Sequence, residues 1–489
     1  MGTEVEKTLQ LKRRAGRAVQ PAPPVRQDAP VMPAQTIGVS AWMAITLWSL
    51  LWLGYNTDIS RVLNPYFPAD TADLIHGVRA FFPILAGWIA LILIFVRSNR
   101  AFYWIMGPIG LMLFYAVLGL ASSATISPEP TIALYYGANY LAIILILLAM
   151  VLVKDPLPDL LKVLKLTWGV SIILTISLLM SVPFLGSPVS EESEIATVRL
   201  KTYNGSGSIL GMASTRNTGF ARYAAISALA VLPGLLRKGN IYLRIVLGII
   251  FGLSVYAEIL ANGRTEILAF IGGVAIIMGA EKARRTVNFM AVIGALILLG
   301  IRGFFSKFFL YFTRTGRLDP TLTGRTETWE VAWRLLWKSP WVGFGFQGDR
   351  YFLRQHMHDA FLHVLFQSGF LGGLAILIAL GITWYYIFYY FFQHQPADRS
   401  LIPPEIPAIF LFVTISSITE STFAYFSAAW LLSAPIVPYV MVLHRRMRTA
   451  SMLAAKERSL RIRLARRKAR FLGPPVEEPP STPGGAIPV

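Results

Sequence analysis

The sequence contains no cysteine, and charged residues make up only 15% of it. The missing cysteines exclude a disulfide framework, a thiol nucleophile and a cysteine-based metal site. The small charged fraction, together with 55% hydrophobic residues over 489 positions, excludes an ordinary soluble globular chain. A cleavable signal pattern is also missing from the N-terminus, because about 35 polar, proline-rich residues precede the first apolar run.

Apolar runs long enough to cross a membrane recur along the chain. A helix rises about 1.5 Å per residue, so about 20 apolar residues span a hydrocarbon core of about 30 Å. Such helices satisfy their own backbone hydrogen bonds, as a lipid environment requires. The sequence therefore predicts an all-α polytopic membrane protein with about 12 transmembrane helices. The expected spans are 36–54, 80–96, 101–122, 131–153, 166–185, 218–236, 241–261, 266–280, 287–301, a segment within 369–392, 406–418 and 426–443.

The basic residues are distributed as in a membrane protein, and we expect no nucleic-acid partner. The formal charge is +19, but much of it lies in two tails and in short loops, where positive-inside orientation accounts for it. Lysine and arginine clusters follow every even-numbered span except the tenth, so both termini are expected in the cytoplasm.

Three parts of the chain are expected. They are a disordered basic tail over 1–35, a transmembrane domain over 36–443, and a basic, then proline-rich tail over 444–489. In the last part, the stretch 456–470 alternates basic and apolar residues. This alternation is typical of an amphipathic helix held by anionic membrane lipids.

Two longer loops, 186–217 and 302–359, face the non-cytoplasmic side in this arrangement. We expect the second loop, between spans nine and ten, to be large and helical. It carries nine basic and five acidic residues, a net charge of +4. The orientation rule disfavours basic residues there, so the excess predicts a polyanionic ligand. Simple solvation of a long loop is the alternative.

Four arginines lie where such a ligand could bind. Arg216 and Arg222 are at the outer mouth of the sixth span, Arg264 is in the turn between the seventh and eighth, and Arg325 is in the second loop. An arginine at a span's outer end should face the bundle or a wet cavity; an interfacial anchor is the alternative. Guanidinium groups match phosphate oxygens, so these arginines could converge on a pyrophosphate.

His358 is the residue best suited to proton transfer, because an imidazole titrates near neutral pH. A structural hydrogen-bonding role is the alternative for a histidine beside a span. A metal site formed by His356, His358 and Asp359 is disfavoured, because residues two apart diverge on a helix and no second acidic cluster is evident. We therefore expect no metal and no cofactor.

Three stretches of the sequence resemble the O-antigen ligase and O-antigen polymerase superfamily of bacterial inner-membrane glycan transferases. The stretch GRTETWEVAWRLLWKSPWVGFGF is similar to the family's entry into its large periplasmic loop, HDAFLHVLFQSGFLGG to its histidine segment, and NGRTEILAF to its arginine turn. The matching positions are Arg325, Trp329, Pro340, Gly343 and Gly345 in the first stretch, His358, Leu362, Gly369 and Gly372 in the second, and Arg264 in the third.

The resemblance implies a metal-independent, inverting transfer of a glycan from undecaprenyl pyrophosphate to an acceptor hydroxyl at the periplasmic face. His358 would take the acceptor proton, and the arginines would neutralise the departing pyrophosphate. The acceptor is the lipid A core in a ligase, another repeat unit in a polymerase, or a protein side chain. The family usually has asparagine after the histidine, whereas this chain has Asp359. That carboxylate would favour an imidazolium at His358 if the two side chains meet.

A secondary transporter or polysaccharide exporter is the alternative function, because twelve spans with both termini inside is a common transporter plan. Transporters place polar residues near the midplane and often show an internal repeat. Here spans four and nine carry no charged residue, and polar residues gather at one face. The polar turn around Thr419 and Glu420 is the most transporter-like feature.

Overall fold

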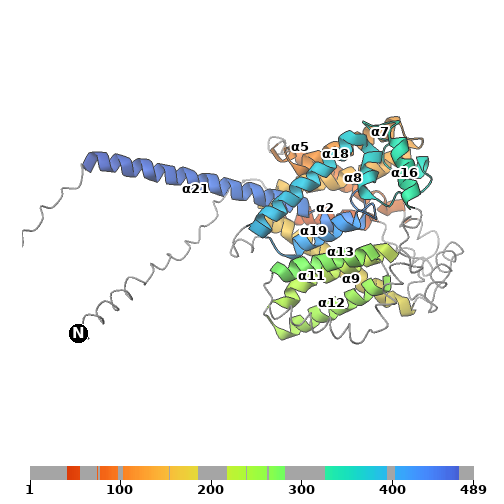
Figure 1. The fold of residues 1–489 in the computed structure, drawn as a ribbon, viewed down its shortest axis with the longest axis horizontal. Coiled ribbons are helices and arrows are strands. Elements are labelled where there is room, and N and C mark those ends of the chain that lie inside the picture. Colours follow the sequence, from red (N-terminus) through yellow and green to blue (C-terminus); the bar gives the residue numbers. More distant parts are fainter. Residues whose placement is uncertain are drawn as a thin grey trace, which may run out of the picture. The chain divides into compact units, whose positions relative to one another are not determined.

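The structure, a computed structural model, describes residues 41–55, 74, 77–96, 103–153, 155–184, 217–237, 239–261, 264–280, 325–393 and 402–472. Within these residues the chain forms helices and no strand (Figure 1), so the predicted all-α class is confirmed. The helices are α2 (Ala41–Gly54), α5 (Phe82–Val96), α7 (Pro108–Thr125), α8 (Pro130–Val151), α9 (Pro156–Phe184), α11 (Asn217–Leu236), α12 (Ile241–Ala261), α13 (Arg264–Ala280), α16 (Arg325–Leu336), α17 (Gly348–Phe352), α18 (Ala360–Phe388), the π-helix η3 (Tyr389–Gln393), α19 (Glu405–Ser416), α20 (Ala428–Ser433) and α21 (Ile436–Leu472).

Eight helices in the described part are long and apolar enough to cross a membrane, and α2, α13 and α19 are shorter apolar helices. They coincide with eleven of the expected spans. The ninth expected span, 287–301, lies outside the described residues, so the number twelve remains a prediction. The chain is a multi-pass membrane protein.

Some spans differ from the sequence prediction in their ends. Helix α9 begins at Pro156 and not at 166, because proline is well suited to the first helical position. Helix α18 begins at Ala360, before the segment expected from 369, because the capping residue Asp359 starts it there. The last expected span consists of α20 and the first turns of α21.

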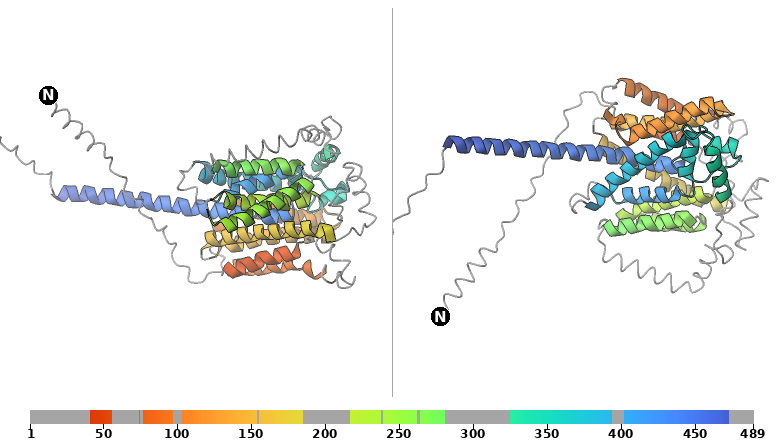
Figure 2. Two further views of the ribbon diagram at one scale, coloured as in Figure 1. Left: turned by 90° about the horizontal axis from the view of Figure 1, so that it is seen from below. Right: turned by 45° about the horizontal axis from the view of Figure 1, so that its top comes forward.

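The helices of the unit 38–443 pack in two groups with α19 between them (Figure 1). In one group α7 contacts α8 and α18, and α8 contacts α5. In the other, α11 contacts α9, α12 and α13, and α13 also contacts α19. Helix α18 packs against α7, as the right-hand view of Figure 2 shows. Large apolar side chains such as Trp88, Ile245 and Ile271 are exposed, as lipid-facing residues are.

Helix α21 continues past the end of this unit. Its part from His444 to Leu472 belongs to a second compact unit. The predicted helix over 456–470 is confirmed, and apolar side chains on it, among them Leu460, Ile462 and Leu464, are exposed. Binding of this helix to anionic lipids remains a prediction.

Helix α18 is kinked near its first third, and the kink fixes the loop that precedes it. Ser368 and Gly369 have non-helical backbone angles, with φ of +63° at Gly369. The kink leaves carbonyl groups of α18 without hydrogen-bond partners in the helix, and backbone amides of the preceding loop donate to them instead. Phe344 N–H donates to the carbonyl of Phe366 at 2.8 Å, and Gly345 N–H donates to that of Gln367 at 2.8 Å.

Glycine is required where the loop and the kink meet. A Cβ on Gly369 would lie 2.2 Å from the carbonyl carbon of Trp341, and one on Gly343 would lie 2.5 Å from the amide nitrogen of Gly369. Both glycines also have positive φ angles, which residues with a Cβ rarely adopt. The two motif glycines therefore hold the loop against α18, and with it the segment that carries His358.

Candidate functional site

A buried carboxylate, Glu420, lies where the turn after α19 meets α11, α16 and the segment before α18. Its Oε2 is 3.2 Å from Nη2 of Arg222 and 3.3 Å from Nδ1 of His358. Its Oε1 is 3.6 Å from Nη2 of Arg325. We call His358, Glu420, Arg222 and Arg325 the Glu420 cluster. The structure thus brings together His358 and two of the four predicted arginines.

Further contacts fix the two arginines of this cluster. Nη1 of Arg325 donates to the carbonyl of Thr419 at 2.6 Å. Nε of Arg222 lies 3.8 Å from a carboxylate oxygen of Glu266, which is buried in the first turn of α13. Each arginine is therefore held by the turn after α19, and Arg222 also by α13. Of the two side chains, Arg325 is the more exposed, at 26% against 12%.

The ionisation of Glu420 decides the tautomer of His358. Burial raises the pKa of the Glu420 carboxyl, but the hydrogen bond with His358 and the charges of Arg222 and Arg325 outweigh this effect and lower the pKa to about 2. An ionised carboxylate can only accept hydrogen bonds. Nδ1 of His358 therefore carries the proton that points to Glu420, and Nε2 is left with a lone pair, as a general base requires.

The backbone around His358 is also unusual. His358 has a φ of +52°, a left-handed conformation that is uncommon outside glycine and clusters at functional sites. Asp359 follows it as the cap of α18, and its carboxylate accepts the amide N–H of Leu362 at 2.6 Å. The next amide, Ala360 N–H, donates to the carbonyl of Ser417 at 2.9 Å. These contacts tie the histidine segment to the turn that carries Glu420.

The cap corrects one expectation about Asp359. Its carboxylate is engaged with the start of α18, and the acidic partner of His358 is Glu420 instead. Asparagine and aspartate cap helices about equally well. An asparagine at this position could therefore cap α18 as well as Asp359 does.

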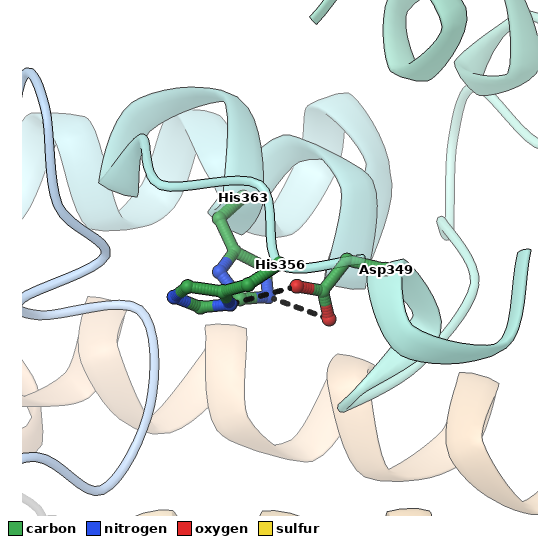
Figure 3. A group of neighbouring side chains, drawn as sticks. All are labelled: Asp349, His356 and His363. Carbon is green, nitrogen blue, oxygen red and sulfur yellow. Dashed lines mark hydrogen bonds and ion pairs between the residues drawn. The ribbon is translucent and has the colours of Figure 1, made fainter. Parts of the chain in front are cut away.

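A second group, the Asp349 cluster, consists of Asp349, His356 and His363 (Figure 3). Nδ1 of His356 lies 3.0 Å from Oδ2 of Asp349, and Nε2 of His363 lies 3.4 Å from Oδ1. The amide N–H of Met357 also donates to Oδ2 at 3.2 Å. All three side chains are nearly inaccessible. The cluster therefore anchors the segment 356–358 between α17 and α18.

The members of the Asp349 cluster differ in their ionisation. Burial raises the pKa of the Asp349 carboxyl, but the charge of His363 and hydrogen bonds from His356 and His363 outweigh it, so the pKa lies well below its usual value. Burial dominates at His356 and lowers its pKa to about 4 despite the bond to Asp349. At neutral pH Asp349 is ionised and His356 is neutral.

The Asp349 cluster could hold a metal ion, because its three ligand atoms lie within 4.8 Å of one another. Two histidines and one carboxylate are also a common zinc-binding set. This group differs from the disfavoured set of His356, His358 and Asp359, since Asp359 caps α18. The rings of His356 and His358 are nevertheless close, with centroids 4.5 Å apart, because this segment is not helical.

Sequence reasoning did not assign three acids to the site. From the sequence, Glu420 is expected only in a polar turn, and no role is predicted for Glu266 or Glu258. Glu258 on α12 is also buried, and neither of its carboxylate oxygens has a hydrogen-bond partner among the residues that the structure describes. The sequence feature that could have identified them is an acidic residue within or beside an apolar span. Placing such a residue there costs free energy, so it usually has a function.

Two of the predicted arginines cannot be placed in the site. Arg216 lies outside the described residues. Arg264 is the first residue of α13, two positions before Glu266, and only its backbone is described. Their predicted roles therefore remain predictions.

Comparison with known proteins bears on the same segment. Residues 249–377 match a family model described as O-antigen ligase. No curated protein matches the chain. The matched stretch runs from α12 into α18 and contains Arg264, Arg325 and His358. The chain is thus similar to the O-antigen ligase family over this stretch, which confirms the resemblance to the O-antigen ligase and polymerase superfamily that the sequence predicts.

Proposed function

We propose that the protein transfers a glycan from undecaprenyl pyrophosphate to an acceptor hydroxyl, with inversion at the anomeric carbon and without a metal. The transfer takes place at the periplasmic face of the bacterial inner membrane, and both termini are cytoplasmic. The observation that carries the proposal is the contact between His358 Nδ1 and Glu420, beside Arg222 and Arg325. His358 and Arg325 lie in the stretch that is similar to O-antigen ligases.

In the proposed step His358 is the general base. Its Nε2 takes the proton of the acceptor hydroxyl while the oxygen forms a bond to the anomeric carbon. The bond between that carbon and the pyrophosphate oxygen breaks, and its electron pair leaves with the pyrophosphate. Glu420 holds the reactive tautomer and stabilises the imidazolium that forms, as the carboxylate does in a catalytic triad.

The arginines are proposed to stabilise the negative charge that grows on the leaving group. Arg325 is the better placed of the two described arginines, because its side chain is more exposed and, among the described residues, contacts a single carboxylate. Arg222 lies between Glu420 and Glu266 and holds the cluster together as well. Arg216 and Arg264 complete the proposed pyrophosphate-binding set.

A complementation experiment tests this function. A strain that lacks the gene receives the wild type, His358→Ala, Arg325→Ala or Arg264→Ala, and its surface glycans and lipid-linked intermediates are resolved on a gel. We expect lipid-linked glycan to accumulate and mature polysaccharide to disappear in all three variants. Long unattached chains indicate a ligase, and single repeat units indicate a polymerase.

Two matched variants serve as controls for complementation. Arg334→Ala lies on the same helix as Arg325, but its side chain is exposed and pairs with Glu330. His444→Ala replaces a histidine outside the cluster. Both should restore normal glycan. Normal glycan in His358→Ala cells, with the variant present in the membrane, would refute the proposal and favour a transporter.

A further inference from the structure

A half-open pocket of about 420 Å³ lies beside the histidine segment. Its size falls within the range of small-ligand sites, about 300–1,000 Å³. It is formed by the first turns of α8, by α17 with the residue before it, and by the turn between α19 and α20. The lining residues used below are Tyr136, Gln347, Arg350, His356, Tyr425 and Phe426.

The pocket reaches the proposed base through His356. This residue lines the pocket, and its ring centroid is 4.5 Å from that of His358. Its Nδ1 is held by Asp349, and its other nitrogen points away from that carboxylate (Figure 3). His356 therefore brings a polar ring to the pocket wall, held in place by Asp349.

Arg350 brings a positive charge to the pocket. Its side chain is exposed on α17, and no ion pair of it is found within the described part of the chain. Arg222 and Arg325, in contrast, are each paired with Glu420. An exposed guanidinium near Gln347 suits a phosphate or carboxylate group.

Most of the remaining wall is aromatic. Tyr425 and Phe426 come from the turn after α19, and Tyr136 comes from α8. Aromatic rings offer flat apolar faces to the C–H groups of a sugar ring, while tyrosine hydroxyls, the Gln347 amide and His356 serve its hydroxyl groups. This combination of aromatic faces, several polar groups and one cation fits a sugar that carries one negative group.

We propose that this pocket is the acceptor subsite and that it binds an anionic sugar, one with a phosphate or a carboxylate close to the attacking hydroxyl. This proposal rests on the proposed transferase function. The donor pyrophosphate uses Arg325 and its neighbours, so the pocket next to His356 is left for the other substrate. A sugar held there lies one histidine ring away from His358, the group that removes its proton.

Direct binding tests the pocket without depending on glycan transfer. Purified full-length protein is titrated with glucose 6-phosphate, glucuronic acid and glucose, and binding is followed by ligand-observed NMR. We expect one or both charged sugars to bind and neutral glucose to bind at least about tenfold more weakly. Preference for the phosphate or for the carboxylate identifies the anionic group.

Two variants with the same charge change separate the pocket from its surroundings. Arg350→Gln should weaken binding of the charged sugar about tenfold or more and leave that of glucose unchanged. Arg354→Gln, four positions on and not lining the pocket, should bind as the wild type does. Equal binding by wild type and Arg350→Gln, or no binding of either charged sugar, would overturn the proposal, provided that all three proteins have the same melting temperature.

Steady-state rates then assign the pocket to one substrate. Arg350→Gln should raise the KM for the acceptor about tenfold and leave the KM for the lipid-linked donor unchanged. A rise in the donor KM alone would place the donor in the pocket and overturn the assignment. If the wild type transfers no glycan but binds the charged sugar through Arg350, this result refutes the transferase function and supports the anionic-sugar pocket.

Discussion

The Glu420 cluster and the Asp349 cluster each hold a histidine Nδ1 on a buried carboxylate, and they lie next to each other in the fold. They differ in where the carboxylate comes from. Asp349 is seven positions from His356, whereas Glu420 is 62 positions from His358, on the far side of α18 and α19 in the chain. The Asp349 cluster is local and shapes one segment, whereas the Glu420 cluster joins segments that are distant in sequence.

The clusters also differ in exposure and charge. The side chain of His358 is 25% exposed, while those of His356 and His363 are 8% and 1% exposed. Two arginines accompany Glu420, whereas no arginine pairs with Asp349 among the described residues. His358 is therefore the most accessible of these histidines and has cations beside it. In the proposed function, the histidine–carboxylate contact supports catalysis in the Glu420 cluster, whereas it holds the backbone in the Asp349 cluster.

The largest effect on the rate is expected from Glu420→Gln. A glutamine can donate its N–H to Nδ1 of His358, which places the histidine proton on Nε2 and removes the base. We expect kcat to fall about 100-fold or more, with little change in the KM for either substrate. The measurement is the initial rate of the purified variant at saturating donor and acceptor.

The matched control for Glu420→Gln is Glu330→Gln. Glu330 is an exposed residue on α16, so the same substitution there should leave the rate unchanged. Gel filtration and thermal unfolding must show that both variants are folded. A folded Glu420→Gln protein with a rate within about threefold of the wild type would show that Glu420 does not set the tautomer.

Asp349→Asn should act mainly on stability. The substitution replaces a buried carboxylate that contacts both His356 and His363. The expected cost is about 1–3 kcal/mol, the range for a buried group that loses its partner. The measurement is the melting temperature, together with the rate per folded molecule, which should fall less than in Glu420→Gln. An unchanged melting temperature with complete loss of transfer would reverse the roles of the two clusters.

Acid should destabilise the two clusters in different pH ranges. The pKa of His356 is lowered from 6.5 to about 4, so below pH 6.5 the unfolded chain binds a proton that the folded chain does not. Stability is lost as the pH falls from 6.5 to about 4. The pKa of Glu420 is lowered from 4.5 to about 2, so its contribution is present above pH 4.5 and is lost between 4.5 and about 2.

Thermal unfolding between pH 8 and pH 3 in steps of about half a unit measures both effects. The melting temperature should already decline below pH 6.5 and decline further below pH 4.5. His356→Gln should remove the first decline and keep the second. If the wild type is equally stable at pH 7 and pH 5, the shift of the His356 pKa is wrong.

Much of the site could be read from the sequence, because its residues belong to short motifs. His358, Arg325 and the motif glycines lie in segments that resemble the family, and the apolar runs gave the helices. The cap of α18 could also have been predicted, since an aspartate directly before an apolar run is a typical helix start. The partner of His358 could not, because Glu420 meets it only after α18 and α19 have packed.

The position of His363 also could not be predicted from its spacing along the sequence. It lies five positions after His358, and a regular helix would turn it away from the site. The left-handed backbone at His358 and the start of α18 at Ala360 change this geometry, so that His363 contacts Asp349 instead. Spacing along the sequence predicts neighbours only where the helix is continuous.

Removal of metal ions is expected to have the smallest effect. The carboxylate of Asp349 already accepts from Met357 and contacts both histidines, so we expect the cluster to keep its shape without an ion. Dialysis against EDTA should leave the melting temperature and the rate unchanged, and elemental analysis should find no metal in proportion to protein. About one zinc per chain, retained by the wild type and lost in His363→Ala, would instead make the Asp349 cluster a metal centre. The fixed position of His356 at the acceptor pocket would then depend on that metal, and EDTA should weaken sugar binding as strongly as Arg350→Gln.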